Sequence, residues 1–137
     1  MADTVEFELV SPEKLLISSP VEMVVVPGAE GDFGVLPGHA PMISALRTGL
    51  ISIWNGGAVE RLVFVAGGFA EVDPEHCTVL AEEAVALDDA EISTVEDRVA
   101  AAREALDRAA DDGARAAAQK QLAVAETLRE AIRTAGG

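Results

Sequence analysis

Two histidines and one cysteine are the side chains best suited to binding a transition metal. His39 stands in a run rich in glycine and proline, His76 and Cys77 are adjacent, and no two of the three have the spacing of a ligand pair. A zinc-type site needs three or four organised protein ligands. The sequence therefore predicts no metal site. His39 is expected in a turn and His76 at the edge of a strand.

Residues 28–34 have the glycine density of a phosphate-binding loop. They lack the Lys-Ser/Thr pair that follows in such loops, and the carboxylates of Glu30 and Asp32 would repel phosphate. Arg129 and Arg133, four residues apart, can clamp a phosphate, but they are also ordinary solvated residues near a helix C-terminus, which is the favoured interpretation. No serine has the context of a nucleophile elbow, so a hydrolase is not expected. We interpret residues 28–34 as a protein-contacting turn.

Charge and composition exclude several classes of partner. The formal net charge is −14, with 3 basic and 13 acidic side chains in residues 1–87 and 7 basic and 11 acidic in residues 88–137. Nucleic acids and anionic membrane surfaces both attract basic proteins, so neither is an expected partner. A protein that binds the first segment should be basic where the two meet. The first residues lack the basic and apolar segments of a signal peptide, and no run is long enough to span a bilayer, so the chain is expected to be soluble and cytoplasmic.

Residues 1–87 show the alternating pattern of β-strands. Val5–Leu9 alternates strictly between apolar and acidic residues, as a half-buried strand does. Asn55-Gly56 between two apolar runs is the strongest hairpin signal in the chain. Gly67-Gly68 and Asp73-Pro74 mark further breaks. Short strands at this spacing predict a β-sandwich or a flattened barrel.

The period changes to that of helices near Asp88. Two apolar seams with heptad-like spacing, separated by 111–113, predict two antiparallel helices: Ile92, Val95, Val99, Ala102, Leu106, Ala109; and Ala118, Leu122, Ala125, Leu128, Ile132. Asp88 and Ser93 are both acceptable N-caps for the first helix. Because the seams are rich in alanine, the helices bury little area, which makes the hairpin a plausible mobile element.

Several motifs resemble the ε subunit of rotary F-type ATP synthases. They occur in the order found in that family and cover nearly all of residues 5–83; the longest is residues 30–41, and the others are 10–13, 21–28, 67–72 and 79–82. The run Gly-Asp-Phe-Gly-Val-Leu-Pro-Gly-His-Ala-Pro within residues 30–41 is highly specific. The predicted helical hairpin follows where the family places it, and the resemblance favours Asp88 as its N-cap.

The resemblance implies a ten-stranded β-sandwich in residues 1–87 and a two-helix hairpin in residues 88–137. It implies a non-catalytic rotor subunit of the central stalk, without a cofactor, that links the γ subunit to the c-ring. Such a subunit transmits torque and helps to couple proton translocation to ATP synthesis. It implies a peripheral position on the cytoplasmic face of the bacterial inner membrane, with possible contacts to the α and β subunits through the helices.

The resemblance also implies roles for individual residues. Those expected to face the c-ring are Glu30, Gly31, Asp32 and Phe33, and those expected near the γ subunit are Ser11, His39 and Ser44.

In some members of the family the hairpin binds ATP and inhibits ATP hydrolysis, which is the regulatory alternative. The motif for ATP begins here with Leu87-Asp88, but Glu91 replaces its arginine. An acidic residue in that place reverses the charge that would hold phosphate. We therefore expect weak or absent ATP binding despite Arg129 and Arg133, and at most mild inhibition.

Overall fold

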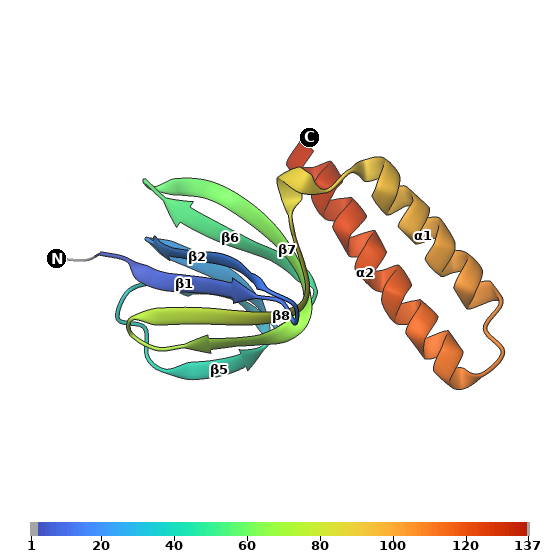
Figure 1. The fold of residues 1–137 in the computed structure, drawn as a ribbon, viewed down its shortest axis with the longest axis horizontal. Helices are drawn as coiled ribbons and strands as arrows, with labels where there is room; N and C mark the ends of the chain where they lie inside the picture. Colours follow the sequence, from blue (N-terminus) through green and yellow to red (C-terminus); the bar gives the residue numbers. More distant parts are fainter. Residues whose placement is uncertain (1–2, 137) are drawn as a thin grey trace. The chain divides into compact units, whose positions relative to one another are not determined.

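The computed structural model describes residues 3–136. The chain divides into two compact units, Met1–Ala86 and Leu87–Gly137, each described here by itself. The first is a sandwich of β-strands and the second a pair of helices (Figure 1). We refer to them as the sandwich unit and the helical hairpin.

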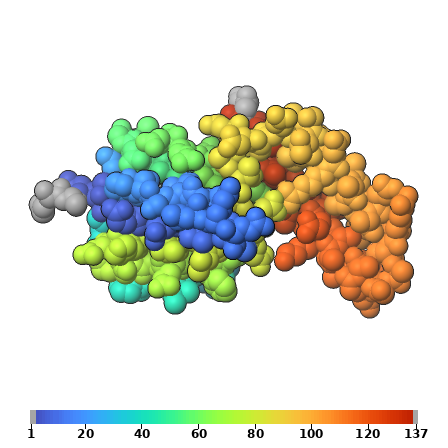
Figure 2. Space-filling model, viewed as in Figure 1, coloured from blue at the N-terminus to red at the C-terminus, as the bar shows by residue number. Residues whose placement is uncertain are grey.

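The sandwich unit has eight strands along the chain: β1 (Val5–Val10), β2 (Leu15–Val21), β3 (Met23–Gly28), β4 (Gly31–Val35), β5 (Met42–Ala45), β6 (Gly49–Asn55), β7 (Ala58–Val72) and β8 (His76–Ala86). They form one continuous sheet in the order β2-β1-β8-β7-β6-β3-β4, and β5 also pairs with β7. All pairings are antiparallel except β1 with β8. Strands β1 and β2 form part of the surface of the sandwich unit and are drawn in blue in Figure 2.

The sheet folds into two layers because β7 and β8 are long enough to take part in both. The first half of β7 pairs with β6, its second half pairs with β5, and β8 pairs with it from Val63 to Val72, across both halves. At the bend, Gly67 and Gly68 have φ of 72° and 115°, backbone angles that residues other than glycine rarely adopt. A Cβ on Gly68 would also overlap the carbonyl oxygen of Leu80. Glycine is therefore required where the sheet turns over.

The expected number of ten strands is wrong, since the described chain has eight. Gly67-Gly68 was interpreted as a break between strands, whereas the ladder between β7 and β8 continues on both sides of it. Each of these two long strands therefore supplies a segment to both layers. The β-sandwich itself is confirmed.

Apolar side chains from both layers meet in one core. Phe7, Leu9, Val24, Ile51 and Val79 have no exposed surface, which fits the alternating pattern of their strands. The predicted Asn-Gly hairpin is also confirmed between β6 and β7, where Asn55 pairs with Ala58. Gly56 and Gly57 between them have φ of 65° and 78°, as a type I′ turn requires.

The helical hairpin consists of α1 (Ile92–Asp107) and α2 (Asp112–Gly136), after a short 3₁₀ turn, η1 (Leu87–Asp89). Neither predicted N-cap is correct: the N-cap of α1 is Glu91, whose side chain makes no capping hydrogen bond. Asp88 lies instead within η1 and Ser93 within α1. Gly113, expected in the turn between the helices, lies in the first turn of α2, which Asp111 caps by accepting a hydrogen bond from the backbone N–H of Ala114 (2.7 Å).

Much of the predicted apolar seam is buried, in agreement with the heptad spacing: Val95, Val99, Ala102, Ala118, Ala125 and Leu128. Ile92 is an exception, since it is the first residue of α1 and is 41% exposed. Val124 is buried although the seam does not include it. Within residues 3–136, no helix has the combination of length and apolar composition needed to cross a membrane.

Candidate functional site

The acidic turn, residues 28–32, joins β3 to β4 and projects Ala29 and Glu30 from the end of the hairpin. Gly28 pairs with Gly31, and Pro27 with Asp32. A Cβ on Gly28 would lie 2.7 Å from the carbonyl oxygen of Gly31 and 3.0 Å from the ring of Phe33, so only glycine fits. The turn is thus a shaped feature of the sheet, as its glycine density predicts.

The connection between β5 and β6 lies against this turn. The backbone N–H of Ala29 donates to the carbonyl oxygen of Ala45 (2.8 Å), and that of Arg47 donates to Pro27 (3.0 Å). Arg47 also uses its side chain, donating from Nη1 to the carbonyl oxygen of Gly28 (2.7 Å) and pairing through Nη2 with Asp32 Oδ1. Sequence reasoning missed Arg47, because no spacing rule places a residue of one loop beside another loop.

The outer face of the layer formed by β5, β7, β8, β1 and β2 carries a row of apolar side chains. The strand register places these residues side by side, and we call them the apolar row: Ala45, Phe69, Leu80, Val10 and Leu15. Phe69 is 56% exposed and Leu15 54% exposed. A groove of about 600 Å³ is lined by every residue of the row except Leu15, and by Ser11. Exposed apolar surface of this kind is typical of a protein-binding site.

Ser11, His39 and Ser44 lie on this layer but not together. Ser11 follows β1, whose last residue pairs with Leu80 near the middle of β8. Ser44 precedes Ala45 in β5, but its side chain lies on the opposite face from the apolar row, since its partner Ala70 is buried. His39 lies at the other end of the layer, where the backbone N–H of Gly38 donates to the carbonyl oxygen of Pro74 (2.8 Å). The distance along β8 from His76 to Leu80 is about 13 Å at roughly 3.3 Å per residue.

His76 and Cys77 begin β8 in environments that do not favour metal binding. His76 Nδ1 lies 3.2 Å from Asp73 Oδ1. That carboxylate accepts hydrogen bonds from the backbone N–H groups of Glu75 (2.8 Å) and His76 (2.7 Å), which lower the pKa of Asp73. Burial raises the pKa of the Cys77 thiol to about 12, so the thiol is protonated at neutral pH. No group of three or more metal-ligating side chains occurs among the described residues.

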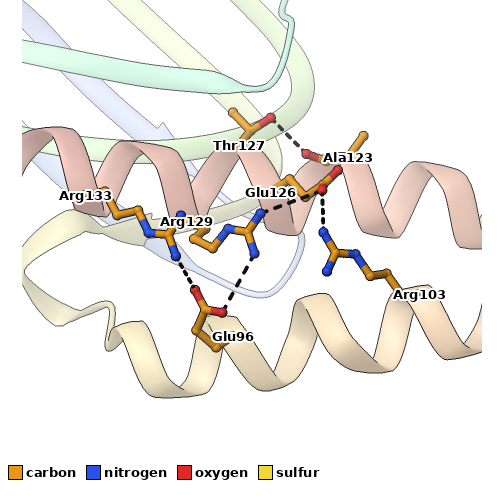
Figure 3. Close-up of polar contacts among 7 residues, drawn as sticks. All are labelled: Glu96, Arg103, Ala123, Glu126, Thr127, Arg129 and Arg133. Carbon is orange, nitrogen blue, oxygen red and sulfur yellow. Dashed lines mark hydrogen bonds and ion pairs between the residues drawn. The ribbon is translucent and has the colours of Figure 1, made fainter.

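The candidate phosphate-binding arginines of α2 face a carboxylate of α1. Arg133 Nη2 lies 3.1 Å from Glu96 Oε1, and Arg129 Nη1 lies 3.7 Å from Glu96 Oε2. Arg129 also pairs with Glu126, which accepts a hydrogen bond from Arg103 of α1 (3.3 Å). Figure 3 shows these side chains converging between the two helices. We call the five charged residues the ion-pair cluster.

The other members of the degenerate ATP motif are not drawn into this cluster. Leu87 is buried in η1, Asp88 is exposed, and the carbonyl oxygen of Glu91 accepts the first hydrogen bond of α1, from Val95 (3.1 Å). An alanine-lined groove of about 720 Å³ also runs between the helices, but its lining includes none of the motif residues. The structure therefore pairs Arg129 and Arg133 with the carboxylate of Glu96 and does not gather the motif residues into one site.

Comparison with known proteins gives a consistent result. Residues 4–87 match the family model described as the β-sandwich domain of the ATP synthase delta/epsilon chain. The chain is 55% identical over 128 residues to the ATP synthase epsilon chain of Rhodospirillum rubrum, covering 93% of this chain and 96% of that one. It is 55% identical over 132 residues to the epsilon chain of Paramagnetospirillum magneticum, covering 96% and 99%.

The fold is also similar to that of a chain in a solved assembly. The cryo-EM structure of the OSCP/F1/c-ring part of Euglena gracilis mitochondrial ATP synthase contains a chain that superposes with a TM-score of 0.80 at 24% identity. The match covers 96% of this chain and 82% of that one. At this identity the likeness concerns the fold alone.

Proposed function

The chain belongs to the family of ATP synthase epsilon chains, and from this we propose that it is a non-catalytic subunit of the central stalk. In this role it links the γ subunit to the c-ring and helps to couple proton translocation to ATP synthesis. It is a peripheral subunit at the cytoplasmic face of the bacterial inner membrane. Residues 1–87 make the link, and residues 88–137 form a separate helical domain that can contact the α and β subunits.

The observation that carries this proposal is that the sandwich unit has two surfaces of different character. The apolar row, with Phe69 and Leu80 at its centre, suits a packed protein interface. The acidic turn, with Glu30 at its tip, suits a polar partner with basic side chains. A subunit that links two other subunits needs two such surfaces.

We assign the surfaces to partners as the family resemblance implies. Glu30, Gly31, Asp32 and Phe33 of the acidic turn and β4 face the c-ring. Ser11 and His39 face the γ subunit, together with the apolar row. Ser44 lies beside this surface in β5, with its side chain on the opposite face from Ala45. Because Ser11 and His39 lie at opposite ends of the layer, the γ subunit must extend along the face to contact both.

The regulatory alternative is not favoured. Arg129 and Arg133 already pair with Glu96 in the ion-pair cluster, so MgATP would have to displace a carboxylate to reach them. Glu91 adds a further negative charge near the start of α1. We expect calorimetric titration with MgATP to show no binding at micromolar concentrations, and a micromolar affinity would contradict this assignment.

Adding the purified chain back to membranes whose F1Fo lacks this subunit tests the proposal. We expect restored ATP-driven proton pumping, measured by quenching of a pH-sensitive dye. Binding to F1 without recovery of pumping would contradict the proposed link. In parallel, F1 lacking the subunit should hydrolyse ATP at equal rates with the full chain or with residues 1–87, because the net acidic helices attract the catalytic subunits weakly. A lower rate with the full chain would instead support the regulatory alternative.

A further inference from the structure

We propose that Arg47 is a positioning residue that neutralises Asp32 within the acidic turn, so that Glu30 alone presents free negative charge to the partner. The inference rests on the proposed function, in which this turn faces the c-ring. It goes beyond that function because it gives the carboxylates of Glu30 and Asp32 different roles. It also assigns a role to a residue outside the turn.

The backbone around Arg47 is fixed on both sides. The N–H of Arg47 donates to the carbonyl oxygen of Pro27 (3.0 Å), and that of Leu46 donates to Gly68 (3.0 Å) at the bend of β7. Gly28 and Leu46 also form an isolated β-bridge. The side chain of Arg47 therefore starts from a backbone that the sheet holds in place.

From this position the guanidinium contacts the turn at two points. Nη1 donates to the carbonyl oxygen of Gly28 (2.7 Å), and Nη2 pairs with Asp32 Oδ1. The side chains of Arg47 and Asp32 are 45% and 58% exposed, and pairs between such exposed side chains contribute little to stability. The main consequence of the pair is thus the distribution of charge, since it cancels the charge of Asp32 at the surface.

Glu30 differs from Asp32 in having no such neighbour. It lies in the two-residue connection between β3 and β4 and is exposed. In the part of the chain that the structure describes, no hydrogen bond or ion pair involves its side chain. A basic side chain of the partner can therefore approach Glu30 without first displacing an arginine, whereas at Asp32 it would have to compete with Arg47.

The test uses the full chain added to membranes whose F1Fo lacks this subunit. The measured quantity is the concentration of chain that half restores ATP-driven proton pumping, at low and at high salt. With Arg47 present, we expect Glu30→Gln to raise this concentration roughly threefold to fivefold at low salt, a factor that one exposed charge pair supplies. We expect Asp32→Asn to raise it less than Glu30→Gln does.

The decisive comparison repeats both changes in an Arg47→Gln background. Removing Arg47 frees Asp32, so the effects of Glu30→Gln and Asp32→Asn should become comparable and the salt dependence of binding should become steeper. Arg47→Lys keeps the positive charge and should keep the preference for Glu30. Arg61→Gln removes the same charge from an exposed position on β7 and should leave the preference unchanged.

Each outcome decides between the interpretations. Equal effects of Glu30→Gln and Asp32→Asn with Arg47 in place, or no effect of either, would overturn the role of Arg47 while the link to the c-ring stands. An unchanged preference in the Arg47→Gln background would also overturn it, since Arg47 would then serve only to stabilise the turn. Failure of the unmodified chain to restore pumping would overturn the proposed function and this inference with it.

Discussion

The core of the sandwich unit is built from large side chains, whereas that of the helical hairpin is rich in alanine. Phe7, Leu9 and Ile51 have no exposed surface, while buried positions of the hairpin include Ala102 and Ala125. Alanine lets helices approach closely but removes little apolar area from water. The hairpin instead places charged pairs along the contact between its helices (Figure 3). One unit therefore depends on packing, and the other also depends on interactions that salt weakens.

This difference between the two cores predicts that truncating one large side chain in the sandwich core strongly lowers the free energy of unfolding. Phe7→Ala removes a fully buried ring and should lower the free energy of unfolding by about 3–5 kcal/mol. Urea unfolding followed by the fluorescence of Trp54, the only tryptophan of the chain, measures this change. Ile43→Ala is a matched control because Ile43 is 72% exposed, and it should change stability by less than about 0.5 kcal/mol. Similar losses in both variants would contradict the packing argument.

The bend of β7 should be nearly as sensitive, for a reason of backbone geometry. Gly68→Ala places a methyl group against the carbonyl oxygen of Leu80 at a φ of 115°, so we expect a loss of about 2–3 kcal/mol. Gly57→Ala separates the two causes, since Gly57 has a φ of 78° but no atom within 4 Å of the added Cβ. It should cost only about 1 kcal/mol. Equal losses of unfolding free energy in the two variants, measured by urea unfolding, would show that the structure relieves the clash at Leu80 without cost.

The smallest effect is expected in the ion-pair cluster. Glu96→Gln removes the carboxylate shared by Arg129 and Arg133. Because Glu96 and Arg133 are about half exposed and only Arg129 is mostly buried, we expect a loss of about 0.5–1 kcal/mol. Thermal loss of the helical circular dichroism signal measures it. Asp97→Asn is the control, because it removes the same charge from the next residue of α1. The difference between the two variants should shrink as salt is added; a difference that persists at high salt would argue for packing instead.

Local signals in the sequence predicted much of the fold. The alternation of Val5–Leu9 and the Asn55-Gly56 pair both correspond to structure that forms between near neighbours. Gly67-Gly68 was misinterpreted because glycine pairs mark both chain breaks and bends, and only the partner strand β8 distinguishes the two. The start of α1 was misplaced because good capping residues stand on either side of Glu91.

The candidate site was less predictable, since it depends on contacts between distant residues. The glycine density of the acidic turn identified it as a shaped loop, but the contact of Arg47 with Asp32 spans 15 positions. Glu96 and Arg133 are 37 positions apart, and no helical spacing relates residues on different helices. The separation of Ser11 from His39 follows from the parallel pairing of β1 with β8, which alternation alone does not specify.

The passage of β7 through both layers has a mechanical consequence. In a sandwich whose layers share no strand, a force on one layer reaches the other through side-chain contacts, which can slide. Here Val63 and Val72 belong to one unbroken strand, hydrogen-bonded to β8 along both halves. A load applied across the unit is therefore carried by covalent backbone and by a ladder pulled in shear, where many hydrogen bonds must yield together. Compliance between the layers should be low, and the glycine bend is the place where elastic deformation would concentrate.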